Sequence, residues 1–317
     1  AWWGYKDLPK FNTDTPAVRR YLLDAARYWI EQGADGWRLD VPNEIDNDDF
    51  WRTFRAKAKA INPNAYITGE IWNEADRWLQ GDQFDSVMNY PLRNAMMGFF
   101  NGGYNGPVGD HVPALNVDQF ESWINGLRNK YDPEISYAQF NLISSHDVER
   151  FASIVGGDFD RLKLAVTFQM TYPGAPVVYY GDEVGMTGSK DPDNRQCFPT
   201  DSSRYNMDVL NHYKTMIGLR NSLSALRTGS FRGLRRHNDL GLYAYVREDK
   251  QNKVVVMLNN SNANRQWDLD VSSVYADGTP LKDALTGQSY TVKGGDVPLT
   301  LRPKQGLVLI ATGNRGK

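Results

Sequence analysis

The chain has 317 residues, enough for two domains or for one large domain with a small appendage, since domains usually hold roughly 100–200 residues. Hydrophobic residues make up 41% and charged residues 23%, which is typical of a globular protein and excludes a disordered or fibrous chain. The 36 basic and 38 acidic residues give a net charge of -2 without a basic run, so nucleic acid is not an expected partner. A membrane is not expected either, because no apolar run approaches the roughly 18 residues that cross a bilayer.

The single cysteine, Cys197, excludes an intrachain disulfide and a cysteine-based metal or redox motif. Together with the lack of a signal peptide in this segment, it favours the cytoplasm, although the compartment stays undetermined.

The first part of the chain alternates helical and strand-like patterns. Helix signals begin at Thr15-Pro16 and end at Gly33, where glycine permits the left-handed turn that often ends a helix. Further helices are expected at 48–61, 75–79, 117–131, 161–170 and 207–226, with an apolar stretch at 95–100. Strands are expected at 35–40, 65–71, 84–90, 138–143 and 175–180, and a loop at 102–107.

The pattern changes at Gly229. Short β-rich runs follow at 241–247, 253–259, 265–269, 297–301 and 306–311, separated by Gly, Asn, Asp and Pro. This spacing predicts a small antiparallel β-sandwich. We therefore expect one domain at 1–228, a second at 229–317, and a frayed tail at 313–317.

Three of the expected strands end near a carboxylate. The runs are GWRLD at 36–40, ITGEIW at 67–72 and NLISSHD at 141–147. Because the carboxyl ends of parallel strands meet at one edge of a sheet or barrel, Asp40, Glu70 and Asp147 could form one site. Alone, Arg38 with Asp40 could be an ion pair and His146-Asp147 a cap, but three such carboxylates favour catalysis.

These motifs resemble the alpha-amylase family of glycoside hydrolases (family 13), in particular its cyclomaltodextrinase, maltogenic amylase and neopullulanase branch. Supporting motifs are LPKFN at 8–12, MNYP at 88–91 and YYGDEVG at 179–185. The resemblance implies a (β/α)8 barrel of which this chain carries about strands 4 to 8, followed by the β-sandwich. A barrel needs eight strands. An open five-stranded sheet would expose apolar surface, so we expect the chain to need the N-terminal half of the barrel, in the same polypeptide or in a separate chain.

The resemblance also implies a retaining glycosidase, in which one carboxylate attacks the anomeric carbon and a second carboxyl protonates the leaving oxygen. Asp40 is the expected nucleophile, and Arg38, two residues earlier on the same strand face, is expected to keep it ionised. Glu70 is the expected acid/base, kept protonated by the nearby negative charge and by an apolar setting that includes Trp72. The carboxyl groups are expected about 5 to 5.5 Å apart.

Further residues are expected to contact the glycan. By the resemblance, Asp147 is the third carboxylate, which distorts the sugar, and His146 binds sugar hydroxyls beside it. Asp191 and Arg195 would bind sugars on the non-reducing side, although such a turn is also common loop chemistry.

The leaving-group side is less defined. Trp72 would stack on a sugar there or belong to the core, and Asn43 and Glu44 would influence acceptor choice. Pro42 replaces a common Ala, which leaves acceptor preference open. The run FPT at 198–200 lacks a common Trp, which leaves part of the sugar-binding wall open.

The expected substrates are maltooligosaccharides, cyclodextrins, starch or pullulan, cleaved at α-1,4 bonds with transglycosylation. No cofactor is expected for the chemistry and no metal ligand is assigned, while a structural calcium ion stays open. The alternatives are a related glucanotransferase or isomerase, and a non-catalytic amylase-like glycan-binding module.

Overall fold

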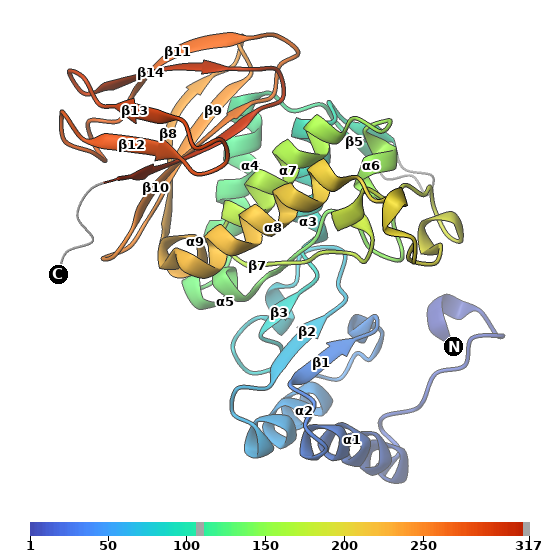
Figure 1. Cartoon of the computed structure of the whole chain (residues 1–317). Coiled ribbons are helices and arrows are strands. Elements are labelled where there is room, and N and C mark those ends of the chain that lie inside the picture. Colours follow the sequence, from blue (N-terminus) through green and yellow to red (C-terminus); the bar gives the residue numbers. More distant parts are fainter. Residues whose placement is uncertain (106–110, 313–317) are drawn as a thin grey trace. The chain divides into compact units, whose positions relative to one another are not determined.

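The computed structural model describes residues 1–105 and 111–312 and divides into two compact units (Figure 1). Unit 1 contains residues 1–91 and 129–140, and unit 2 contains residues 92–128 and the chain from Asn141 onward. The predicted tail at 313–317 and part of the predicted loop at 102–107 lie outside the described residues.

Unit 1 is built on a parallel sheet. Its strands, in spatial order, are β1 (Gly36–Leu39), β2 (Tyr66–Gly69) and β3 (Ser86–Val87). A parallel bridge from Met88 to Phe140 continues the pairing. The helices α1 (Pro16–Glu31) and α2 (Asp48–Ile61) pack beside β1 and β2 in one hydrophobic core (Figure 1). The smaller elements of this unit are η1 (Trp2–Gly4), η2 (Pro42–Glu44), η3 (Asp76–Trp78) and α5 (Pro133–Ala138).

Local chemistry explains the bounds of the two helices. Pro16 occupies the first turn of α1, where its missing N–H costs no hydrogen bond. Asn47 caps α2 by accepting a hydrogen bond from the Phe50 N–H, and Asp48 and Asp49 place negative charge at the positive end of the helix dipole. Both helices therefore begin where the sequence predicts.

Unit 2 begins with a helical layer. Its main helices are α3 (Tyr90–Phe100), α4 (Val117–Lys130), α7 (Phe159–Thr171) and α8 (Met207–Ser222). The first two residues of α3 and the last two residues of α4 belong to unit 1. Its shorter elements are β4 (Tyr104–Asn105), β5 (His111–Val112), α6 (Phe151–Ile154), β7 (Ala175–Pro176), η4 (Asp182–Val184), η5 (Asp193–Arg195), η6 (Ser202–Arg204) and α9 (Ser224–Thr228). Strand β6 (Phe140–Asn141) pairs with β7. The predicted helix at 207–226 is thus two helices, because Leu223 adopts an extended conformation between them.

The C-terminal part is antiparallel, as predicted. A six-stranded sheet contains, in spatial order, β13 (Ser289–Thr291), β12 (Pro280–Asp283), β15 (Gly306–Ala311), β10 (Lys253–Asn259), β9 (Leu242–Glu248) and β8 (Ser230–His237). A second sheet pairs β11 (Arg265–Asp270) with β14 (Asp296–Leu301).

Both faces of the larger sheet are buried. In β10, Val254 and Val256 join the core formed with the helices, whereas Val255 and Met257 join the core shared with β11 and β14. Because successive side chains of a strand point to opposite faces, this burial explains why β10 is an uninterrupted apolar run. The boundary predicted at residue 228 is not tested by this packing and stays a prediction.

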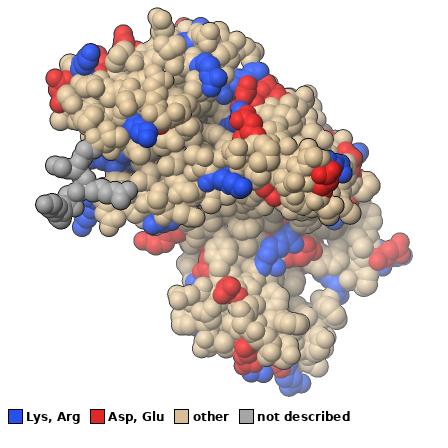
Figure 2. Space-filling model, in the orientation of Figure 1, with Lys and Arg blue, Asp and Glu red and all other residues tan. Residues whose placement is uncertain are grey.

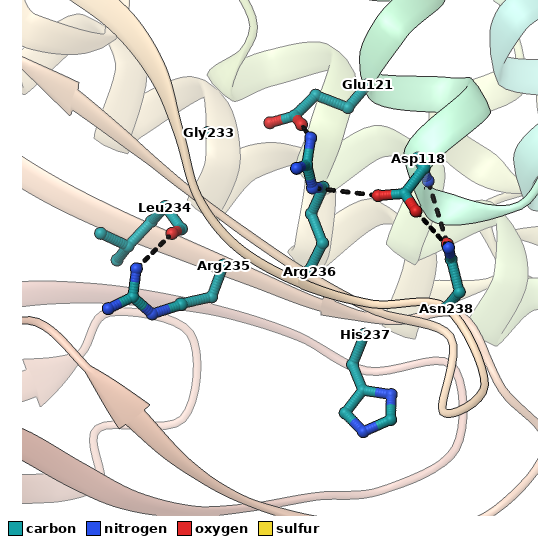
Figure 3. A pocket seen from close by; sticks show the side chains of 8 residues that line it. All are labelled: Asp118, Glu121, Gly233, Leu234, Arg235, Arg236, His237 and Asn238. Atoms are coloured by element: carbon teal, nitrogen blue, oxygen red, sulfur yellow. Dashed lines mark hydrogen bonds and ion pairs between the residues drawn. The ribbon is translucent and has the colours of Figure 1, made fainter.

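Helix α4 contacts the edge strand β8 through charged side chains, of which Glu121 is buried. The Glu121 carboxylate contacts the Arg236 guanidinium, while Asp118 contacts Arg236 and Asn238 (Figure 3). Glu121 also accepts a hydrogen bond of 3.3 Å from the Tyr243 hydroxyl. Gly233 permits this approach, because a Cβ there would overlap the Glu121 carboxylate. These residues line a pocket of about 560 Å³.

The described strands do not close into a barrel, so the fold is a partial α/β domain followed by an antiparallel β domain, as the sequence predicts. Within the described residues, no helix is both long and apolar enough to span a bilayer. On the face drawn in Figure 2, basic and acidic side chains are interspersed, which agrees with the absence of a basic run in the sequence.

Candidate active site

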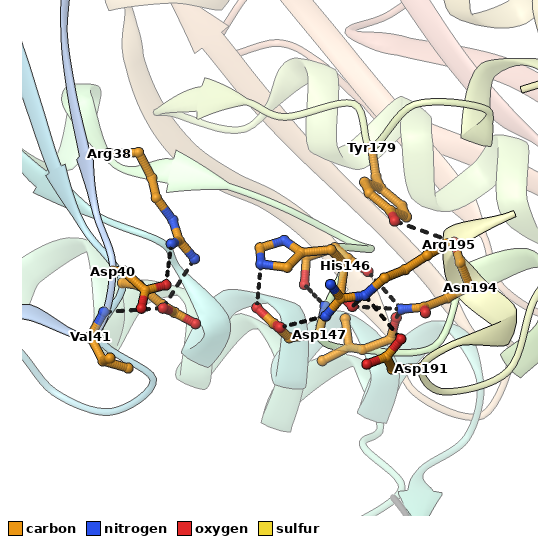
Figure 4. A network of polar contacts seen from close by, with 12 residues as sticks. Arg38, Asp40, Val41, His146, Asp147, Tyr179, Asp191, Asn194 and Arg195 are labelled. Atoms are coloured by element: carbon orange, nitrogen blue, oxygen red, sulfur yellow. Dashed lines mark hydrogen bonds and ion pairs between the residues drawn. The ribbon is translucent and has the colours of Figure 1, made fainter. Parts of the chain in front are cut away.

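The first polar cluster lies in unit 1, at the end of β1. Arg38 Nη1 lies 2.7 Å from Asp40 Oδ1, and Arg38 Nη2 lies 3.0 Å from Glu70 Oε2 (Figure 4). One guanidinium therefore holds both carboxylates through neighbouring nitrogens. The spacing of Arg38 and Asp40 predicts their contact, whereas the contact with Glu70 depends on the parallel pairing of β1 with β2, in which Leu39 lies opposite Gly69.

Glu70 is a buried carboxylate surrounded by donors. Its residue is 5% exposed, and its side chain accepts a 3.1 Å hydrogen bond from the Val41 N–H and another of 3.1 Å from Trp72 Nε1. Glu70 is thus enclosed by polar N–H groups where the sequence analysis expects an apolar setting, and its acid/base role stays a prediction. Trp72 meets Glu70 through its polar N–H and not through its apolar ring.

Val41 is a residue that the sequence analysis missed. Its φ of 31° and ψ of 55° lie in the left-handed region, which is costly for a β-branched residue. This conformation occurs between the candidate nucleophile and η2, where the Val41 N–H reaches Glu70. Strained backbone of this kind persists where surrounding structure enforces it, commonly at functional sites.

The remaining predicted residues of unit 1 surround this cluster. The Trp72 ring stacks on Tyr90 with a centroid distance of 4.0 Å and an interplanar angle of 7°, so one face of the indole is covered by protein. Asn43 and Glu44 are half-buried in η2, directly after Pro42. The main-chain carbonyl of Glu44 accepts a 2.7 Å hydrogen bond from Lys10 Nζ, which ties the N-terminal segment to this turn.

The second polar cluster lies in unit 2 and contains the other four predicted residues. His146 Nε2 lies 3.0 Å from Asp147 Oδ2, and Arg195 Nη2 lies 3.4 Å from Asp147 Oδ1. Arg195 Nε also lies 3.1 Å from Asp191 Oδ1 (Figure 4). Two sequence segments that are 44 residues or more apart, His146-Asp147 and Asp191–Arg195, are thus joined through one arginine.

A buried ion pair between Arg150 and Asp182 lies next to the second cluster, because Arg150 also donates to the carbonyl of Asn194. Arg150 is fully buried, lies 2.9 Å from Asp182 Oδ1 and stacks on the Tyr179 ring at 4.3 Å. Burial raises the pKa of Asp182 to about 6, against the opposing effects of a hydrogen bond from Ser144 and of the Arg150 charge. The Gly181 N–H donates to Glu183 Oε2 at 2.7 Å, so Glu183 closes the turn that follows Tyr180.

The described residues contain no group of three or more His, Cys, Asp or Glu side chains placed to hold a metal ion. In both clusters carboxylates are paired with arginine, and carboxyl groups can serve in acid/base and nucleophilic chemistry.

Comparison with known proteins identifies the class. The profile of the alpha-amylase catalytic domain matches residues 2–207, and that of the cyclo-malto-dextrinase C-terminal domain matches residues 238–310. The chain therefore belongs to the alpha-amylase family of glycoside hydrolases. Within this family it falls in the cyclomaltodextrinase and neopullulanase branch, as the sequence motifs predict.

Individual relatives support that placement. Neopullulanase 2 from Thermoactinomyces vulgaris is 42% identical over 302 residues, which cover 95% of this chain and 49% of that protein. A cyclomaltodextrinase from a Bacillus species is 45% identical over 257 residues, or 81% of this chain and 44% of that protein. The crystal structure of Ttha1563 from Thermus thermophilus has a TM-score of 0.92 at 39% identity, covering 98% of this chain and 66% of that one. The chain spans about half the length of the curated relatives it matches.

Proposed function

We propose that this chain carries the catalytic carboxylates of a retaining glycoside hydrolase. Its substrates would be maltooligosaccharides, cyclodextrins, starch or pullulan, cleaved at α-1,4-glucosidic bonds with some transfer to other sugars. The observation that best supports the proposal is the pairing of Asp40 and Glu70 by Arg38, because a retaining glycosidase needs two carboxyl groups close together.

In the proposed mechanism, Asp40 attacks the anomeric carbon while Glu70 gives its proton to the departing glycosidic oxygen. The bond from the anomeric carbon to that oxygen breaks as the bond to Asp40 forms, giving a covalent glycosyl ester. Glu70, now ionised, takes a proton from water as the water oxygen attacks the anomeric carbon and displaces Asp40. A sugar hydroxyl in place of water gives transglycosylation.

Asp147 and His146 are proposed to bind sugar hydroxyls. Arg195 and Asp191 are proposed to contact sugars on the non-reducing side of the bound glycan. The contacts around Asp147 support this role, because Arg195 Nη2 lies 3.4 Å and His146 Nε2 lies 3.0 Å from its two carboxylate oxygens, which gives the carboxylate a defined orientation. Trp72, Asn43 and Glu44 stay proposed contacts on the acceptor side.

The direct test is reducing-sugar release from cyclodextrin, pullulan and starch by the protein complete with its N-terminal half barrel. Asp40→Asn, Glu70→Gln and Asp147→Asn are each expected to lower kcat by roughly 10³-fold or more, because each removes a group acting in the transition state. Asp49→Asn, an exposed carboxylate paired with Arg19, is the matched control and should leave kcat unchanged. Equal activity in the wild type and the three site variants would refute the assignment.

The same assay separates the alternatives. A glucanotransferase or isomerase would consume the glucan with little release of reducing ends, so product chain lengths are measured alongside. A non-catalytic glycan-binding module would itself be retained on a gel that carries maltooligosaccharides, and it would release no product from the soluble glucans.

We also propose that the chain requires the N-terminal half of the barrel, in the same polypeptide or as a separate partner. In unit 1, β1 pairs with β2 alone among the described strands, and large apolar side chains are exposed, including Trp3, Phe11, Tyr21 and Trp29. Relatives about twice as long support the same proposal.

A further inference from the structure

Asn194 connects the two segments that form the second polar cluster. It is fully buried in η5, and its Nδ2 donates to three main-chain carbonyls, those of Ser145 (3.2 Å), His146 (3.0 Å) and Val148 (2.8 Å). These carbonyls surround Asp147, so one amide group contacts the backbone on both sides of it.

Asn194 is itself held in place by its main chain. Its carbonyl accepts hydrogen bonds from Arg150 Nε at 3.1 Å and from the Tyr179 hydroxyl at 3.2 Å. Arg150 is in turn paired with the buried Asp182. The neighbouring Arg195 adds a 3.0 Å bond from its Nε to the His146 carbonyl. The position of the turn at 145–148 therefore depends on the buried Asn194 and its partners, with one further bond from the exposed Arg195.

The chemistry of this contact admits few other residues. Three carbonyl oxygens can be satisfied together by an NH₂ group, which carries two hydrogens and can share them. A carboxylate of the same shape would instead face three acceptors, and a hydroxyl could serve a single one. Loss of the amide would remove a donor from the buried carbonyls of Ser145 and Val148, whereas the His146 carbonyl would keep its bond from Arg195 Nε.

We propose that Asn194 is a positioning residue, which fixes the turn Ser145–Val148 and so directs His146 and Asp147 toward the sugar. The inference rests on the proposed function of Asp147 and adds to it a residue that touches no substrate. A displacement of about 1 Å of a substrate-orienting group can lower the rate by roughly 10²-fold, even when the change lies away from the reacting atoms.

The test is a double-mutant cycle in the complete protein, with kcat referred to active sites titrated by a covalent inhibitor. Asn194→Asp, and the milder Asn194→Ser, are expected to lower kcat by roughly 10²-fold with little change in KM, because the turn would be misplaced in the transition state. In an Asp147→Asn background, the same substitutions should cause little further loss, since Asn194 would act through a group already disabled.

Asn259 provides the matched control. It is equally buried, and its Nδ2 donates to the carbonyls of Ala263 (2.9 Å) and Arg302 (2.8 Å) in the C-terminal domain. Asn259→Asp should lower thermal stability without changing kcat per active site. Independent, multiplicative losses in the double variant, or an unchanged kcat per site in both Asn194 variants, would overturn the inference. Full activity of Asp147→Asn alone would overturn the proposed function itself.

Discussion

In each of the two polar clusters, one arginine orients the acidic side chains by contacting two carboxylates. Arg38 holds Asp40 and Glu70, and Arg195 holds Asp147 and Asp191. Arginine suits this role because its planar guanidinium presents several donors in fixed directions, which a lysine ammonium does not. Each of these four carboxylates is thus oriented by a contact with a guanidinium group.

At the same scale, the buried His212 predicts a pH dependence of stability. Burial lowers the pKa of His212 to about 4, and its Nε2 lies 3.0 Å from Thr167 Oγ1. The unfolded imidazole takes up a proton below its ordinary pKa of 6.5, whereas the folded one stays neutral until about pH 4. The stabilising contribution of neutral His212 is therefore present above its ordinary pKa of 6.5. It is lost as the pH falls from 6.5 toward 4.

Between pH 7 and pH 5 this linkage amounts to about 2 kcal/mol of unfolding free energy. The variant His212→Gln keeps an amide donor for Thr167 but does not titrate. Its unfolding free energy should therefore fall by about 2 kcal/mol less than that of the wild type between pH 7 and pH 5. Denaturant unfolding at the two pH values measures the difference, with His237→Gln, at an exposed histidine, as control. Parallel losses in wild type and His212→Gln would contradict the prediction.

Residue spacing predicts part of the site. It predicts the contact of Arg38 with Asp40, because the two residues are two positions apart on one strand face. It could not predict the roles of Val41 and Asn194. The first depends on a backbone conformation that valine rarely adopts, and the second on carbonyls some 46 to 49 residues away.

Among the elements, β1 depends on a close approach of backbones. Gly36 lies opposite Tyr66, and a Cβ at Gly36 would overlap the Tyr66 carbonyl. Gly36→Ala should force β1 away from β2, lowering stability by about 2 kcal/mol or more and separating Arg38 from Glu70.

Thermal unfolding and reducing-sugar release together check this prediction. Gly126→Ala, within α4, is the control, because nothing lies within 4 Å of its added Cβ and a helix interior favours alanine over glycine by about 0.5–1 kcal/mol. A melting temperature and a rate of sugar release equal to those of the wild type in Gly36→Ala would contradict the prediction.

In the C-terminal domain the sequence predicts the strands with an apolar run, β9, β10 and β15, and two strands exposed on one face, β11 and β14. The central strands β9, β10 and β15 are apolar runs, whereas β8 and β13, which the sequence analysis missed, are the two edges of the sheet. β8 carries Arg232, Arg235 and Arg236, since an edge strand can expose polar side chains without loss of pairing. The missed β12 and α5 are too short, at 4 and 6 residues, for a periodicity to appear.

At the scale of the whole molecule, the central expectation is dependence on a complement. Expressed alone, the chain should associate or melt without a cooperative transition, because exposed aromatic side chains such as Tyr21 and Trp29 would lack a partner surface. Co-expression with the N-terminal half should give a soluble complex, or a single polypeptide containing both halves should melt cooperatively. Size-exclusion chromatography and calorimetry measure this. A monodisperse, cooperatively melting monomer of this chain alone would refute the dependence.

The identity of the nucleophile is the claim on which the proposed chemistry depends most directly. The complete protein is incubated with a fluorinated maltosyl fluoride. This reagent forms the covalent glycosyl ester readily, and the ester hydrolyses slowly, so the labelled peptide can be mapped by mass spectrometry. The account predicts one glycosyl group per chain, attached to Asp40 and absent from Asp40→Asn. A label on another residue, or undiminished turnover in Asp40→Asn, would contradict it.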